Sequence, residues 1–478
     1  MVSQSQETVG SLRKSAREPS GFLDLRFQMM LAVAFMAVLL AVSPLVPGVK
    51  WLEPGDFSST AEVVYYHTVM FELVMLGLLT VSYVVGLPKR LSLAVSASNV
   101  PIMVLSVLGV GLSYPAWAST ANNVVQGLRD FWLFVLSLAV LIGFLASPFI
   151  DREVKSLARA ACSAYALLVV SMASALIAGF MGLTAAWGEY LNFAGPSWVM
   201  SLINNWEGPS TFLGNVITSH SHEMLPAVGG AIVALVAMEV GYSSYRGPAR
   251  RLVDAGMIVA IFGTISMTVL YIISSYGTYS IPTIATFGPN GVNGLALDDS
   301  QTGLIGLGAL IVAVGLIGSC VLASRPMSRR NLLILEIATW VAAIFVLVGI
   351  GYPIEFNEAF FGFGVNGTPP TGGPGFMYDD LFRRGHILFA FYLMPVLAGA
   401  VASAIALVNS DEKALNAAKV SLYVGLIGIV LGADGVLVWM LSNGLGQVLA
   451  TGLAIVVLTL FIVVYIMVVE GRGRTNSK

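Results

Sequence analysis

The stretch Ser219-His220-Ser221-His222-Glu223-Met224-Leu225 lies near the start of a long apolar segment and holds two of the four histidines in the chain. The other two, His67 and His386, also lie a few residues inside long apolar segments. A histidine in a lipid-spanning helix is costly and calls for a partner. Four histidines at one depth in three such segments predict ligands for a group bound inside the membrane.

The composition is that of a polytopic membrane protein. Of the 478 residues, 57% are hydrophobic and 10% are charged, whereas soluble domains have about a quarter charged residues. The formal net charge of −2 gives no indication of a nucleic-acid partner. Residues 1–26 carry four basic residues without a following cleavage site, so they are expected to form a cytoplasmic tail.

Segments of about 20 apolar residues can cross a bilayer, and the sequence predicts twelve of them. They are expected at 27–47, 64–87, 95–114, 130–150, 158–183, 213–240, 253–275, 302–323, 332–352, 384–408, 418–441 and 446–469. They form one transmembrane domain, 27–470, followed by a short tail, 471–478.

Basic residues gather in every second connection between these segments. Of the 24 Lys and Arg residues, only Lys50, Arg129, Arg383 and Arg384 fall in the other connections. Because cytoplasmic loops are the basic ones, both termini are expected in the cytoplasm, with the chain crossing the plasma membrane many times.

The histidines repeat every four segments. His67 is in the second, His220 and His222 are in the sixth, and His386 is in the tenth. All three segments run from outside to inside, with the histidines near the outer end. This predicts an all-α fold of twelve transmembrane helices in three four-helix arcs with a pseudo-threefold arrangement.

Residues i and i+2 of a helix point about 200° apart, so His220 and His222 face opposite sides and cannot share one ion. Each can instead pair with His67 or with His386, and the sequence leaves open which pairs with which. Two bis-histidine sites of this kind suit haem b, with an iron between two imidazoles in a wide apolar slot. The alternative is that the histidines hydrogen-bond neighbouring helices.

Other polar residues are candidates for supporting such sites. Arg383 and Arg384, and less directly Arg129, are expected to bind haem propionates, unless they serve as interfacial anchors. Glu72 and Glu223 could orient a ligand imidazole or carry protons. Asp434, inside the eleventh segment, is a further proton-path candidate; helix packing is the alternative for all three acids.

Twelve spans with histidines on the second, sixth and tenth resemble subunit I of the haem–copper oxidase superfamily, which includes nitric oxide reductases. The resemblance implies that His67 ligates a low-spin haem. The superfamily's copper site needs a histidine pair on helix 7, and the seventh segment, around Ile258–Ile273, has no histidine. Copper is therefore not expected. The run His220–Leu225 also resembles the His-x-His-Glu-Met-Leu signature of the NnrS family, haem proteins linked to nitric oxide stress.

These features together predict a subunit of a respiratory complex that holds two b-type haems. Its partners would be other membrane subunits. A quinol would be the electron donor, or an outer-side cytochrome or copper protein would be the electron acceptor. Bis-histidine iron has no open position, which favours electron transfer over gas chemistry. Two alternatives remain: a haem protein that reacts with nitric oxide or oxygen, and an ion-coupled secondary transporter that uses Asp434, Glu72 and Glu223.

Overall fold

A computed structural model describes residues 21–49, 60–206, 208–276, 283–287, 293–322 and 394–407. Nearly all of these residues are helical. The α-helices are α2 (Leu25–Val42), α3 (Thr60–Val81), α4 (Lys89–Leu112), α5 (Ser119–Ile150), α6 (Arg152–Ala160), α7 (Cys162–Leu191), α8 (Ser197–Trp206), α9 (Pro209–Glu239), α10 (Gly247–Tyr276), α11 (Leu297–Leu322) and α14 (Met394–Leu407). Short helical turns are η1 (Gly21–Leu23), η2 (Ser43–Leu45), η3 (Ser82–Gly86), η4 (Ala116–Ala118) and η5 (Tyr242–Ser244).

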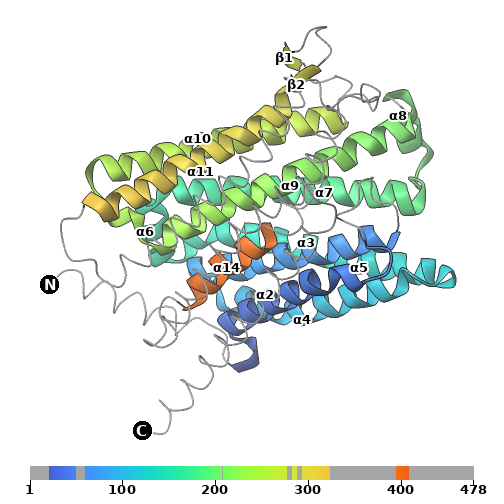
Figure 1. Cartoon of the computed structure of the whole chain (residues 1–478), viewed down its shortest axis with the longest axis horizontal. Coiled ribbons are helices and arrows are strands. Elements are labelled where there is room, and N and C mark those ends of the chain that lie inside the picture. Colours follow the sequence, from blue (N-terminus) through green and yellow to red (C-terminus); the bar gives the residue numbers. More distant parts are fainter. Residues whose placement is uncertain are drawn as a thin grey trace.

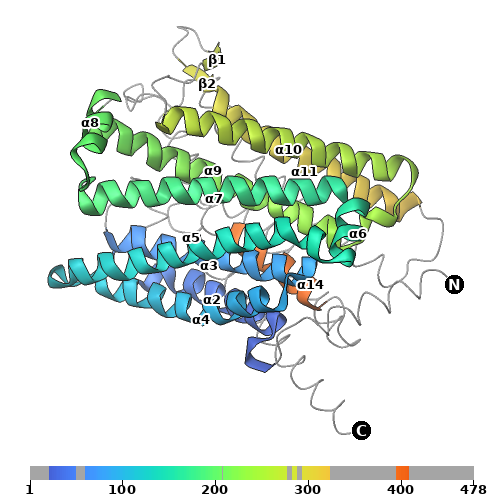
Figure 2. The ribbon, with the colours of Figure 1, turned by 180° about the vertical axis from the view of Figure 1, so that it is seen from behind.

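The protein is a membrane protein with long apolar helices. Six helices in the described ranges are long and apolar enough to span a bilayer, and the shorter apolar stretches Leu25–Leu40 and Gln301–Leu316 accompany them. The helices lie side by side in one bundle (Figure 1). The pair α10 and α11 forms one side, α2 and α4 form the other, and α7 and α9 lie between them (Figures 1 and 2).

Several helices are longer than the predicted spans. The largest difference is in α5, which begins at Ser119 rather than near residue 130. The extra three turns bury Asn122, Gln126 and Arg129 against the bundle, and their polarity hides the helix from a hydropathy window. α4 likewise begins at Lys89 rather than near residue 95.

The second half of the chain is described only in part. α11 matches the eighth predicted span and α14 covers the inner part of the tenth. The spans at 332–352, 418–441 and 446–469 lie outside the described residues, as do both predicted tails apart from residues 21–26. The twelve-helix count and the three-arc arrangement therefore stay predictions.

Two connections at one end of the bundle carry structure of their own. The helix α8 precedes α9, and an antiparallel hairpin of β1 (Thr283–Phe287) and β2 (Asn293–Ala296) precedes α11. Figure 1 shows both at the end opposite α6. The basic residues 152–159 lie in α6, so the charge rule predicts that the α8 end faces outward, and the two ends are named outer and inner on that prediction.

Glycines bring α10 and α11 into backbone contact. A Cβ built on Gly256 would lie 2.6 Å from the carbonyl oxygen of Gly308, and one on Gly263 would lie 3.0 Å from the carbonyl oxygen of Gln301. Gly315 approaches Val253 equally closely. Helices in lipid associate through such small residues because no hydrophobic driving force brings them together.

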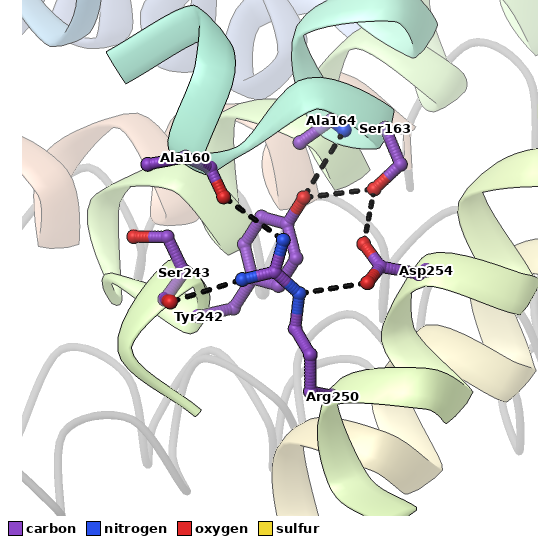
Figure 3. Close-up of polar contacts among 7 residues, drawn as sticks. All are labelled: Ala160, Ser163, Ala164, Tyr242, Ser243, Arg250 and Asp254. Carbon is purple, nitrogen blue, oxygen red and sulfur yellow. Dashed lines mark hydrogen bonds and ion pairs between the residues drawn. The ribbon is translucent and has the colours of Figure 1, made fainter. Parts of the chain in front are cut away.

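At the inner end, Arg250 at the start of α10 ties three elements together (Figure 3). Its Nε donates to Asp254 Oδ2 over 2.7 Å, and its two terminal nitrogens donate to the carbonyl oxygens of Ser243 and Ala160, each over 2.9 Å. The guanidinium carbon also lies 4.6 Å from the centre of the Tyr242 ring. Every nitrogen of this guanidinium has a partner.

The same cluster continues onto α7. Ser163 Oγ donates to Asp254 Oδ1 over 2.6 Å and lies 2.8 Å from the hydroxyl of Tyr242, which also accepts from the amide of Ala164. Tyr242 is fully buried. We name the set Arg250, Asp254, Ser163 and Tyr242 the inner clamp, because it joins the first turn of α7 to the α9–α10 connection (Figure 3).

Candidate functional site

Two of the four histidines meet in the outer half of the bundle. His67 of α3 and His220 of α9 have ring centres 6.4 Å apart and ring planes inclined by 15°. Direct stacking would need a closer approach. A metal ion bonded to one nitrogen of each ring at about 2 Å would place the ring centres about 6 Å apart. The spacing therefore suits two imidazoles on either side of one ion.

Hydrogen bonds fix which nitrogen of each ring is available. His67 Nδ1 donates to the carbonyl oxygen of Val63 over 2.8 Å, and His220 Nδ1 donates to the carbonyl oxygen of Ala178 over 2.7 Å. A carbonyl oxygen only accepts, so Nδ1 must carry the proton and a neutral ring keeps its lone pair on Nε2. Metal-bound histidines are held in this way by a backbone carbonyl. Neither Nε2 has a hydrogen-bond partner in the described part of the chain.

The position of His220 depends on a glycine of α7. A Cβ built on Gly182 would lie 2.7 Å from Cε1 and 2.9 Å from Nδ1 of His220. Any other residue at 182 would therefore push the ring away. By contrast, a Cβ on Gly179, one turn earlier, would make only ordinary contacts at 3.7 Å and beyond.

A buried cation lies close to the histidine pair. Arg129 of α5 is 1% exposed. Its Nε donates to Asp130 Oδ1 over 3.0 Å, and its guanidinium carbon lies 4.0 Å from the centre of the Phe71 ring. That ring is 5.9 Å from the His67 ring. Nη1 of Arg129 is buried and has no partner among the described residues, so it is free to donate to an anionic group.

The other histidine of the pair on α9 points elsewhere. His222 meets the ring of Tyr271 on α10 with centres 6.5 Å apart. His220 and His222 thus face different neighbours. His386, with which a second pair was predicted, lies outside the described residues, as do Arg383, Arg384 and Asp434.

Glu223 belongs to a hydroxyl chain that links three helices. Its Oε1 accepts from Ser174 Oγ of α7 over 2.9 Å, and Ser174 Oγ accepts from Thr268 Oγ1 of α10 over 2.7 Å. Glu223 is fully buried, and its Oε2 has no partner among the described residues. The carboxyl group lies at the centre of the α7, α9 and α10 bundle.

Glu72 is more isolated. It is 1% exposed, and neither carboxylate oxygen has a partner in the described ranges. The bond that orients His67 goes to Val63 rather than to this acid. Glu72 and Glu223 are therefore both deeply buried, but the structure connects only Glu223 to other polar side chains.

The histidine pair can be compared with the ligand sets of a bare metal ion and of haem, the predicted cofactor. The described residues contain no group of three or more His, Cys, Asp or Glu side chains that could hold an ion alone. A haem supplies four of its iron's ligands itself and needs two more. His67 and His220 would provide these, and Arg129 would offer a donor for a propionate. The residues present thus fit this cofactor.

Sequence reasoning missed three residues of this site. Gly182, Asp130 and Phe71 have no distinctive pattern, because contact across helices decides what they do. The position of Gly182 on the helix before His220 was a usable signal, since small residues mark close approaches in membranes. Asp130 follows Arg129 directly, and the pair could have been noticed as adjacent opposite charges.

The chain matches no protein-family model, no curated protein and no solved structure in the comparisons made. The interpretation of the site therefore depends on its geometry.

Proposed function

We propose that the protein binds haem b within the membrane and transfers electrons as a subunit of a respiratory complex in the plasma membrane, with both termini in the cytoplasm. The observation on which this proposal rests is the pairing of His67 with His220. The rings are nearly parallel, 6.4 Å apart, and held by Nδ1 bonds that leave both Nε2 atoms available.

The chain's own residues set the properties of this centre. His67 and His220 would hold the haem iron through Nε2, and Val63 and Ala178 fix the orientation of the two rings. Arg129 would donate to a propionate, and it keeps positive charge beside the ring of Phe71. The haem, when bound, would supply a one-electron couple. Because two protein nitrogens would hold the iron, the residues favour electron transfer over reaction with nitric oxide or oxygen.

A second b-type haem between His222 and His386 completes the proposal. The opposite directions of His220 and His222 support two sites rather than one. Copper has no place in it, since the seventh predicted span has no histidine. The proposed partners are other membrane subunits, with a quinol as donor or an outer-side cytochrome or copper protein as acceptor.

The test is an optical spectrum of the purified full chain, oxidised and dithionite-reduced, with a pyridine haemochrome assay. We expect b-type haem with low-spin bands that carbon monoxide leaves unchanged. His67→Leu should remove the haem held with His220, and His222→Leu should leave that haem in place. Each variant is compared with wild type for haem per chain.

Two results would change the assignment. A carbon monoxide shift in the wild type would show an open iron position and move the function to nitric oxide or oxygen chemistry. Absence of haem from protein purified with added haemin would overturn the proposal, and ion-coupled transport through the buried Glu72 and Glu223 would then be the next function to assay.

A further inference from the structure

A row of buried polar atoms runs along one face of α5 from its outer end toward the histidine pair. Asn122, Gln126 and Arg129 are spaced by four and three residues and are between 1% and 3% exposed. Asn122 Oδ1, Gln126 Nε2 and Arg129 Nη1 are buried without hydrogen-bond partners in the described ranges. Residues at this spacing lie on one face of a helix. The row therefore forms a continuous polar strip.

The neighbouring helix α4 adds a further polar group and a glycine that lies close to α5. Ser106 is 1% exposed, and its Oγ also lacks a partner among the described residues. Gly109 lies one turn further out on the same face. A Cβ built on Gly109 would lie 3.6 Å from Gln126 Cγ, 3.7 Å from Val64 Cγ1 and 3.9 Å from Asn122 Oδ1. These are ordinary contact distances, so Gly109 brings α4 close to the side chains of Gln126 and Asn122, and one added methyl group would fit against them.

Leaving these atoms unpaired would be expensive. A buried donor or acceptor without a partner costs about 1–3 kcal/mol, and lipid offers it no substitute. An ordered water that makes two to four hydrogen bonds relieves this cost at a polar site with enough room. Asn122 Oδ1 beside Gly109 and the unpaired atoms of Gln126, Ser106 and Arg129 are the polar partners that such waters need.

We propose that the interface between α4 and α5 is a hydrated seam that carries water from the outer surface to Arg129. The seam consists of Asn122, Gln126 and Arg129 on α5 with Ser106 and Gly109 on α4. Its ligand is water, held by an acceptor on Asn122 and donors on Gln126 and Arg129. Its inner end is the guanidinium that also contacts Phe71, the neighbour of His67.

Such a seam would let protons move to and from the outer side when the charge of the histidine centre changes. That role rests on the proposed function, whereas the hydration does not. Water would carry these protons, because the amide, hydroxyl and guanidinium groups of the seam do not titrate near neutral pH.

The test uses thiol accessibility in the full chain, reconstituted in vesicles, with Cys162 and Cys320 replaced by serine. Gln126→Cys is compared with Leu128→Cys, which lies at a similar depth on the lipid-facing side and is 52% exposed. Silver ion, added from the outer side, is small enough to follow water and reacts with the thiolate form. We expect Gln126→Cys to react about tenfold faster, because the thiolate forms in water and not in lipid.

A second substitution sharpens the test. Gly109→Ala fits its surroundings without a clash but places a methyl group 3.6 Å from Gln126 Cγ and 3.9 Å from Asn122 Oδ1, which narrows the contact between α4 and α5. Added to Gln126→Cys, it should slow the silver reaction toward the rate of Leu128→Cys. Equal rates for Gln126→Cys and Leu128→Cys in folded protein would overturn the proposal.

A second measurement, on protein that carries no cysteine substitution, covers the case in which Gln126→Cys fails to fold. X-ray radiolysis in water labelled with oxygen-18 should mark the peptide 119–133 in wild type, and Gly109→Ala should lose most of this label. Background labelling in both proteins would also overturn the proposal. Neither readout involves haem, so failure of the seam and failure of the proposed function can be distinguished.

Discussion

The inner clamp and the surroundings of the histidine pair differ in how fully their polar groups are hydrogen-bonded. In the inner clamp, all three guanidinium nitrogens of Arg250 are bonded, and both oxygens of Asp254 accept hydrogen bonds. In the outer half, Arg129 Nη1 and the Nε2 atoms of His67 and His220 have no partner among the described residues. Two arginines of one chain thus differ in a useful way. Polar atoms that are all hydrogen-bonded hold helices together, whereas polar atoms without a partner among the described residues are available to bind a ligand.

The largest effect is expected from filling the space that the histidine ring occupies. Gly182→Ala places a methyl group 2.7 Å from Cε1 of His220, so the ring must turn and its Nε2 loses its direction toward the centre. We expect haem bound between His67 and His220 to fall about tenfold or more, in line with misplaced metal ligands. Pyridine haemochrome per chain measures it.

Gly179→Ala is the matched control for that substitution. It adds the same methyl group one turn away on the same helix, where contacts begin at 3.7 Å. It should retain wild-type haem content. Equal losses in the two variants would mean that α7 as a whole is sensitive, and that Gly182 has no special relation to His220.

The next effect concerns the open arginine. Arg129→Gln removes a buried positive charge near the centre and leaves Asp130 without its ion-pair partner. The oxidised form of a haem is more positive than the reduced form, so losing the cation should lower the midpoint potential by tens of millivolts. Arg129→Lys keeps the charge and should shift the potential less. Potentiometric titration followed at the reduced haem band measures both, and an upward shift in Arg129→Gln would contradict the placement.

Breaking the inner clamp should affect stability and leave the centre unchanged. Arg250→Ala removes three hydrogen bonds at a site where the side chain is 24% exposed. We expect a loss of about 1–3 kcal/mol in the free energy of unfolding with an unaltered haem spectrum. Arg251→Ala, at the exposed neighbouring position, should cost little. Thermal unfolding in detergent compares the two variants. A changed haem spectrum in Arg250→Ala would contradict the prediction that the inner clamp affects stability alone.

The smallest effect is a pH dependence of the same clamp. Burial raises the pKa of the Tyr242 hydroxyl, while its bond with Ser163 acts in the opposite direction. The hydroxyl ionises near pH 10 in the unfolded chain, so its contribution to stability is complete below that pH. The contribution is lost as the pH rises through the higher value in the folded protein. Thermal unfolding between pH 8 and 11 should show this loss in wild type and a reduced loss in Tyr242→Phe.

The sequence predicted the class of the protein and the positions of most described helices, because runs of apolar residues register directly in hydropathy. It placed the start of α5 about three turns late. The reason is that Asn122, Gln126 and Arg129 face the interior rather than lipid, and a hydropathy window cannot distinguish a polar residue in a helix from one in a loop. The count of twelve helices is untested beyond α11, apart from α14.

The candidate site was predictable in its residue types but not in its pairing. Helix geometry required His220 and His222 to face different neighbours, yet nothing in the sequence chose between His67 and His386 as the partner of His220. The structure places His67 beside His220 because α3 and α9 are in contact. The small residue that admits the ring, Gly182, lies on a third helix, so the sequence could mark it as a small residue but could not identify it as the neighbour of His220.

The glycine contacts between α10 and α11 also bear on how the chain assembles. Gly256 and Gly263 on one helix, and Gly308 and Gly315 on the other, repeat at seven residues, which keeps the two backbones together along a left-handed crossing. The two helices are consecutive in the chain and need no cofactor to meet. We expect them to form a stable helical hairpin soon after insertion into the membrane. Segments synthesised later would then pack against a bundle that already contains the α10–α11 pair.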